Sequence, residues 1–285
     1  MTASPERSPN TFHCAITPRY TDLDTWRHVN NSRIYQFHQE ARLLAHRNIF
    51  GPDAWFSDDV RIRPIRSVTD YKLVTWYGSE VQASVEILDC QHDTYTVRSD
   101  LYQNGVHVGS QRCILGGFDR GDRTALPDSI RDAIQAAATG QSFDLAAADY
   151  RERLKLTSAF PVRQQLTPRY ADMDADSQRS EAALARYMEQ ARFSGIRTLD
   201  MGGLGILIAS ADISFEHYRP SFKPVELASG ITRIGNSSFV FTGCAVHEGE
   251  IQASANSVMV VIDPSSNRPV PIPQSLRDQL VTLSL

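Results

Sequence analysis

The fold of this chain is decided by residues 18–31, which have the sequence PRYTDLDTWRHVNN. Just before them, residues 12–16 alternate apolar and polar side chains, and this period of two predicts a short strand. Just after them, apolar side chains recur at helical spacing and predict a long amphipathic helix: Ile34, Phe37, Ala41, Leu44 and Ala45. The stretch is therefore a strand-to-helix connection that holds two carboxylates, a histidine and two asparagines.

The start of this helix is suited to attack on a carbonyl group. Asn30 or Asn31 is the expected N-cap, because an Asn side-chain oxygen accepts an amide of the first turn. The backbone N–H groups of a first turn point out of the helix and carry a partial positive charge. A carboxylate a few residues earlier, such as Asp24, can face whatever those amides bind.

The pattern Asp-Leu-Asp-x-x-x-His-Val-Asn-Asn, followed by Phe37 and by residues 40–42, resembles the signature of hot-dog-fold acyl thioesterases. The resemblance is to the 4-hydroxybenzoyl-CoA thioesterase family and to the acyl-ACP thioesterases. The sequence departs from the signature at three positions, where relatives have Asn, Gly and Tyr: Trp26, Arg27 and Ile34. These departures leave the reaction class unchanged and leave the acyl preference open.

The opening motif recurs after 150 residues. The tetrapeptide TPRY occupies residues 17–20 and again residues 167–170, and Asp22 and Asp24 correspond to Asp172 and Asp174. We therefore predict two units, an N-terminal domain at 11–136 and a C-terminal domain at 160–285, joined by a linker at 137–159. Two units in one chain would be the fused counterpart of a symmetric dimer.

Each unit continues with four strand-like runs rich in Val, Ile, Thr and aromatic residues. We predict strands at 62–71, 81–89, 95–103 and 106–118, and at 206–216, 226–234, 239–247 and 251–262. Asn104-Gly105 and Glu248-Gly249 fit hairpin turns. The predicted fold class is α+β, and the resemblance makes it two tandem hot-dog domains, each an antiparallel sheet wrapped around one long helix.

The second copy has lost most of the motif. Gln178, Arg179, Ser180 and Glu181 stand where the first copy has His28, Val29, Asn30 and Asn31. A glutamate at the helix start has the wrong sign for a developing oxyanion. We predict one competent site per chain, in the first unit, although Asp174 alone is still able to act as a base.

The resemblance makes Asp24 the catalytic carboxylate, which either attacks the thioester carbonyl or deprotonates a water. The alternative is that Asp24 only braces the turn. The backbone amide of Asn31 is the expected oxyanion donor. His28 either orients the carboxylate or the leaving thiolate, or is a histidine with a purely structural hydrogen bond.

Four further residues are expected to contact substrate. Trp26 and Arg27 are expected to narrow the mouth of the pocket. Alternatively, Arg27 contacts a CoA phosphate. Asn30 lies beside the oxyanion site, with capping as its alternative role. Tyr35 lies one place after the position where relatives carry Tyr.

Composition narrows the class of protein. The chain has 285 residues, 41% of them hydrophobic, and a formal net charge of −4, which does not suggest a nucleic-acid partner. No apolar run is long enough to span a membrane, and the N-terminus lacks a signal-peptide core. The four scattered cysteines favour a reducing compartment, so we expect a cytoplasmic protein without disulfides or a metal site.

These observations predict a thioester hydrolase that acts on acyl-CoA or acyl-ACP and needs no cofactor. The fused chains are able to assemble further into a homo-oligomer. The alternative function is a non-catalytic acyl-CoA-binding or assembly protein on the same scaffold. Hot-dog hydratases are disfavoured because their Gly-Asp-x-Asn-Pro-x-His pattern is missing, and α/β-hydrolases because no Gly-x-Ser-x-Gly elbow occurs.

Overall fold

The computed structural model describes residues 10–52, 61–141 and 159–285, and these form two compact units. The first unit takes in residues of the segments Met1–Arg63, Lys72–Asp119 and Thr124–Leu145. The second takes in residues of Pro64–Tyr71, Arg120–Arg123 and Ala146–Leu285. Most of the predicted linker, from 142 to 158, lies outside the described residues.

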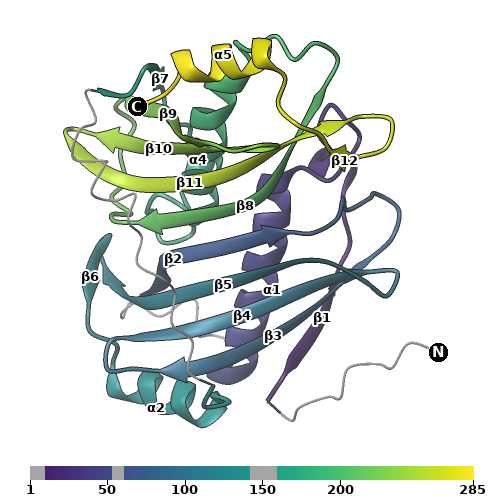
Figure 1. Ribbon diagram of the computed structural model, residues 1–285. Coiled ribbons are helices and arrows are strands. Elements are labelled where there is room, and N and C mark those ends of the chain that lie inside the picture. The colour runs from purple at the N-terminus through teal and green to yellow at the C-terminus, as the bar shows by residue number, and fades with distance from the viewer. Residues whose placement is uncertain (1–9, 53–60, 142–158) are drawn as a thin grey trace. The chain divides into compact units, whose positions relative to one another are not determined.

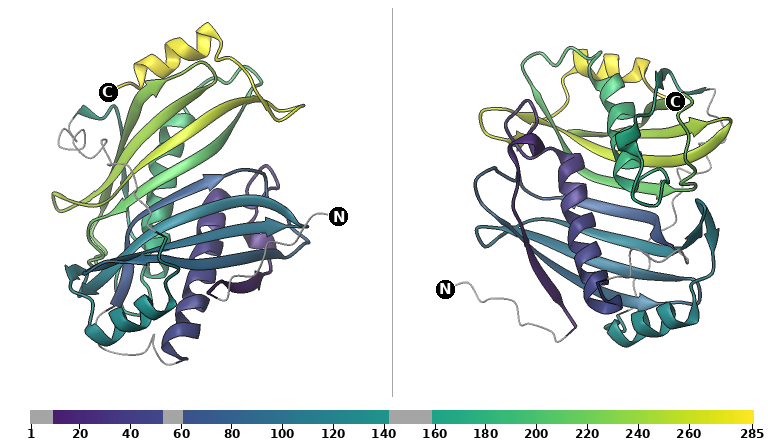
Figure 2. Two further views of the ribbon diagram at one scale, coloured as in Figure 1. Left: turned by 60° about the horizontal axis from the view of Figure 1, so that its bottom comes forward. Right: turned by 180° about the vertical axis from the view of Figure 1, so that it is seen from behind.

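The first unit is an antiparallel sheet with one long helix, α1, lying across one face (Figures 1 and 2). The strands pair in the order β1-β3-β4-β5. The elements are β1 (Phe12–Ile16), η1 (Tyr20–Asp22), α1 (Asn31–Phe50), β3 (Val81–Cys90), β4 (Thr94–Gln103), β5 (Val106–Asp119) and α2 (Asp128–Ala137). Two strands contribute residues to both units: β2 (Arg61–Tyr71) and β6 (Asp122–Thr124).

Alternation along the strands builds the core of this unit. Val81, Ala83 and Val85 on β3 are buried while their neighbours are more exposed, as expected for a sheet with one covered face. The covering helix buries Phe37 and Ala41 at the spacing that the sequence predicts.

The second unit repeats the plan with α4 (Glu181–Ile196) against its sheet (Figure 2). Its strands pair in the order β8-β11-β10-β9-β7, and residues 66–70 of β2 pair with β8 inside the same unit. The remaining elements are β7 (Val162–Leu166), η4 (Tyr170–Asp172), β8 (Gly205–Phe215), β9 (Val225–Ile234), β10 (Ser238–His247), β11 (Glu250–Asp263), β12 (Arg268–Pro269) and α5 (Gln274–Thr282).

The predicted fold class, two tandem hot-dog domains, is confirmed. The eight predicted strands that follow the two long helices end within one residue of the observed strands. Both hairpin turns have the positive φ angles of a type I′ turn, with Asn104 at 52° and Gly105 at 76° in the first. Asn30, rather than Asn31, is the N-cap of α1.

Candidate active site

The strand-to-helix connection closes on itself just before α1. Leu23 and Val29 form an antiparallel bridge, and inside it the Asp24 amide donates to the His28 carbonyl over 2.8 Å. Outside the bridge, the Asn30 amide donates to the Asp22 carbonyl, also over 2.8 Å. The loop from 24 to 28 is therefore a fixed turn that ends two residues before the N-cap.

Arg27 occupies the one position of this turn with a left-handed backbone. Its φ is 65°, a conformation in which glycine is usual because it has no Cβ. Ser177, the equivalent residue of the second copy, has a φ of 57°. The departure from Gly thus leaves the backbone conformation of the turn unchanged and adds an exposed arginine side chain.

One oxygen of the Asp24 carboxylate braces the turn. Asp24 Oδ1 accepts hydrogen bonds from the amides of Trp26, over 2.8 Å, and His28, over 3.2 Å. The carboxylate is half-exposed, and Oδ2 takes part in none of the hydrogen bonds found among the described residues. The turn therefore holds the carboxylate through Oδ1 and leaves Oδ2 without a hydrogen bond among the described residues.

Asp22 has a different task, because its carboxylate is buried and paired. It accepts from the Arg19 amide over 2.8 Å and from the Arg19 guanidinium over 3.0 Å, and Arg33 lies 3.8 Å away. These contacts tie the connection to the first turn of α1 and leave Asp24 as the carboxylate able to meet a ligand.

The N-terminus of α1 is capped by a side chain. Asn30 Oδ1 accepts the Ser32 amide over 2.7 Å and the Ser32 hydroxyl over 2.6 Å. Asn31 is the first helical residue, so its amide belongs to the turn whose N–H groups point out of the helix end. Capping by Asn30 is thereby the observed role of that side chain.

The other predicted residues differ in exposure. Trp26 and Arg27 lie on the surface, and His28 is half-buried with its ring edge-on to Trp76 at a centroid distance of 4.8 Å. Tyr35 is only 1% exposed and belongs to the interior of the protein.

Residues 75–77 lie beside the turn, although no sequence motif connects them with it. The Val29 amide donates to the Thr75 carbonyl over 2.9 Å, which fastens this segment to the turn. The Trp76 backbone is held on both sides by the Gln103 side chain, which accepts its N–H over 2.9 Å and donates to its carbonyl over 2.8 Å. Only tertiary structure brings the segment, some 45 residues later in the chain, to the motif.

The second copy keeps the turn and fills the space around it. Asp174 Oδ1 accepts the amides of Asp176 and Gln178 over 3.0 and 3.1 Å, as Asp24 does in the first copy. Arg179, in place of Val29, is fully buried; it donates to Tyr187 Oη over 3.3 Å and to the Ser221 carbonyl. A buried arginine and a glutamate at the helix start make this copy unlike the first.

Whole-chain comparison with solved structures gives matches that span both units. The 12:0-ACP thioesterase from Umbellularia californica matches with a TM-score of 0.71 and 13% identity, over 88% of this chain and 94% of that one. The chain has the fold of the acyl-ACP thioesterases. An acyl-ACP thioesterase from Bacteroides thetaiotaomicron matches with a TM-score of 0.63 and 12% identity, over 88% and 98%. A putative oleoyl thioesterase from Lactobacillus plantarum matches with a TM-score of 0.68 and 10% identity, over 91% and 97%.

Sequence comparison finds a narrower likeness. The family model of the thioesterase superfamily matches residues 180–254, from the N-cap of α4 into β11. The match thus covers α4, strands β8 to β10 and the start of β11, and none of the turn at 172–179. No curated protein matches the sequence.

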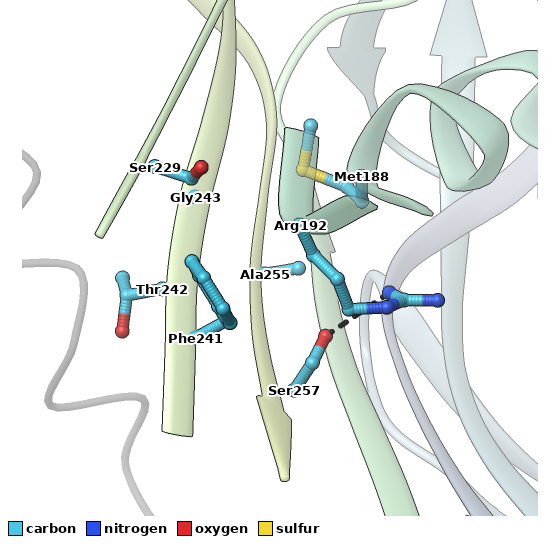
Figure 3. Close-up of a pocket in the computed structure, with 8 residues that line it drawn as sticks. All are labelled: Met188, Arg192, Ser229, Phe241, Thr242, Gly243, Ala255 and Ser257. Atoms are coloured by element: carbon cyan, nitrogen blue, oxygen red, sulfur yellow. Dashed lines mark hydrogen bonds between the residues drawn. The ribbon is translucent and has the colours of Figure 1, made fainter. Parts of the chain in front are cut away.

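A cavity in the second unit lies between α4 and strands β9, β10 and β11 (Figure 3). Its volume of about 10 Å³ is just sufficient for one water molecule. Arg192 lines it and donates to Ser257 Oγ over 3.2 Å. This cavity is too small for an acyl chain and is suited to a single buried water.

Two general features bear on the partners of the protein. Among the described residues, no helix is both long and apolar enough to cross a membrane. Cys14, Cys90, Cys113 and Cys244 are all free thiols.

Proposed function

We propose that this protein is an acyl thioester hydrolase with its active site in the first unit. The observation that carries the proposal is the Asp24 carboxylate. It is held through one oxygen by two amides of a fixed turn, it is half-exposed, and the N-terminus of α1 follows seven residues later. The fold that the chain shares with acyl-ACP thioesterases supports the same assignment.

In the proposed mechanism Asp24 Oδ2 does the chemical work. It either attacks the thioester carbonyl carbon, so that a C–O bond forms and the C–S bond breaks to give an anhydride and a thiolate, or removes a proton from an attacking water. In the first route water then hydrolyses the anhydride. Both routes use the same oxygen and produce a carboxylic acid and a free thiol.

The helix start stabilises the charge that develops on the thioester oxygen. The amide of Asn31 acts together with the partial positive charge of the α1 N-terminus. His28, two positions before the N-cap, supplies a proton to the leaving thiolate. Trp26 and Arg27 are exposed residues of the same turn, where they would contact the carrier of the acyl group.

The proposed substrates are acyl thioesters of CoA or of an acyl carrier protein. The proposed location is the cytoplasm, because four free thiols suit a reducing compartment.

The duplicated turn supplies a matched pair of variants for the test. Asp24→Asn keeps an oxygen that is able to accept the Trp26 and His28 amides, and Asp174→Asn makes the same change in the second copy. Thiol release from a panel of short, long, branched and aromatic acyl-CoAs is measured with a thiol reagent. We expect Asp24→Asn to lose about 100-fold or more in rate and Asp174→Asn to stay near wild type.

Equal losses in the two variants would contradict the assignment of the site to the first unit. An Asp24→Asn protein with wild-type turnover on its preferred substrate would refute Asp24 as the reacting group. Circular dichroism and thermal melts of both variants check that the fold is retained.

One observation favours the alternative, a non-catalytic acyl-CoA-binding protein. Asp174 makes the same two hydrogen bonds in a copy that lacks the rest of the motif, so bracing the turn is sufficient reason for an aspartate there. This alternative predicts saturable acyl-CoA binding by the wild-type protein without thiol release from any member of the panel.

A further inference from the structure

Four aromatic side chains around the candidate site are largely exposed to solvent. Their exposed fractions range from 52% to 76%, and we call the group the aromatic patch: Tyr20, Trp26, Trp76 and Tyr77. All four belong to the first unit. Large aromatic side chains gathered at the surface near a functional site are more often a contact area for a ligand or partner than isolated exposed residues are.

Two ring contacts join the connection before α1 to the segment that follows β2, and Trp26 lies in the same connection. The Tyr20 and Tyr77 rings meet edge to face at 6.3 Å, and the His28 and Trp76 rings at 4.8 Å. The two hydrogen bonds between the Gln103 side chain and the Trp76 backbone hold this segment in place without a ligand. Rings that are already placed bind a flat ligand at a smaller entropic cost.

The second copy has kept the turn but not the tryptophans. Asp176 stands in place of Trp26. In the first copy the Val29 amide donates to the Thr75 carbonyl, and the next residue is Trp76. In the second copy the Arg179 amide donates to the Tyr218 carbonyl, and the next residue is Arg219. Arg219 is in turn paired with Asp122 at 2.8 Å. The tryptophans therefore accompany the intact motif and not the scaffold.

Two exposed cations lie on the same surface segments. Arg27 follows Trp26 in the turn, and Lys72 lies four residues before Trp76. Aromatic faces beside basic side chains suit a ligand that combines a flat heteroaromatic ring with phosphate groups.

We propose that the aromatic patch binds the adenine ring of coenzyme A, with Arg27 and Lys72 near its phosphates, so that the enzyme prefers CoA over a protein-bound carrier. The inference rests on the proposed function, because it assumes a thioester at Asp24. A 4′-phosphopantetheine arm on a protein has no nucleotide, and stacking on the patch would separate the two carriers.

Isothermal titration with free CoA and with 4′-phosphopantetheine tests the proposal without requiring catalysis. We expect wild-type protein to bind CoA about tenfold or more tightly than 4′-phosphopantetheine. Trp76→Ala and Trp26→Ala are expected to lose about tenfold in CoA affinity and to keep their affinity for 4′-phosphopantetheine. Because both side chains are more than half exposed, either variant is expected to fold.

Exposed aromatic residues of the second unit give the controls. Tyr170→Ala and Phe222→Ala remove rings that are 86% and 56% exposed and are expected to leave CoA affinity unchanged. Asp24→Asn is expected to bind CoA like wild type, so a failure of hydrolysis and a failure of nucleotide binding are separate results. Equal affinity of wild type for the two ligands would overturn the proposal. A tryptophan variant that loses affinity for both ligands equally would also overturn it. A variant in which only the sedimenting mass changes would instead assign the patch to contact with a second copy of the chain.

Discussion

Two histidines inside the first unit are predicted to make its stability depend on pH. His38 and His46 lie on the same side of α1 and are 0% and 1% exposed. His38 Nδ1 lies 2.7 Å from Ser99 Oγ, and His46 Nε2 lies 2.8 Å from Tyr95 Oη. Burial, and secondarily the positive charge of Arg42, lowers the pKa of each imidazole from 6.5 to about 3.

A histidine with a lowered folded-state pKa favours the unfolded state as the solution becomes more acidic. Below pH 6.5 the unfolded chain binds protons that the folded chain does not, so stability falls as pH falls, down to about pH 3. Between pH 7 and 5.5 the linkage relation gives about 1 kcal/mol for each histidine, or roughly 2 to 3 kcal/mol together. This figure holds for any folded-state pKa below roughly 4.5, because the folded group then stays neutral over the whole interval.

The test is urea unfolding at several pH values between 7 and 5.5, followed by circular dichroism. The second copy provides the substitutions His38→Met and His46→Ile, since Met188 and Ile196 occupy those positions there. The double variant loses the hydrogen bonds to Ser99 and Tyr95, so its stability at pH 7 changes too. The deciding quantity is the loss of stability between pH 7 and 5.5, which we expect to be smaller in the double variant by roughly 2 to 3 kcal/mol.

His92→Gln is the control, because the side chain of His92 is 83% exposed and its loss is expected to leave the slope unchanged. A double variant with the wild-type slope would show that neither buried histidine resists protonation. The reasoning from burial would then be wrong, whatever the stability at pH 7.

Two further predictions use the duplication. Asn30→Ala and Ser180→Ala each remove the N-cap of a long helix. The Asn30 side chain accepts the Ser32 amide, and the Ser180 side chain accepts the Ala183 amide. Each substitution is expected to lower the free energy of unfolding by about 1 kcal/mol. Chemical denaturation of the two variants checks this, and a loss from only one of them would contradict the equivalence of the caps. Tyr187→Phe places in the second copy the residue that the first copy has at position 37. It removes a hydroxyl that donates to buried Asp172 over 3.0 Å and accepts from Arg179. We expect the free energy of unfolding to fall by about 1–3 kcal/mol. A thermal melt unchanged from wild type would mean that water replaces the hydroxyl.

The elements of the fold could be predicted because they depend on local signals. The period-two strands, the helical stripe of Phe37 and Ala41 and the hairpin at Asn104-Gly105 are each encoded within a short window. The repeat supported these predictions, because the pattern of the long helix and of each strand occurs twice in the chain. The turn at Asp24 was equally local, and so was the choice of Asn30 or Asn31 as the cap.

The surroundings of the site could not be predicted, because they come from distant parts of the chain. Nothing in the sequence connects Thr75 or Gln103 with the motif, yet one fastens to Val29 and the other holds Trp76 in place. The burial of Arg179 was also unexpected, since arginine is seldom fully buried without partners. Its hydrogen bonds to Tyr187 and the Ser221 carbonyl supply those partners and are visible only in the folded unit.

Comparison of the two aspartates distinguishes two roles proposed for Asp24, bracing the turn and catalysis. In both copies Oδ1 accepts two turn amides, so the turn alone explains why Asp174 persists after the rest of its motif has been lost. Its persistence shows that bracing alone is reason enough for an aspartate, so catalysis by Asp24 has to be tested separately. The copies differ in the residues at the end of the turn and the helix start: His28, which contacts Trp76, and Asn31 in one, and a buried Arg179 and Glu181 in the other. A carboxylate becomes a catalyst through those neighbours, which is why the comparison of Asp24→Asn with Asp174→Asn is decisive while either variant alone is not.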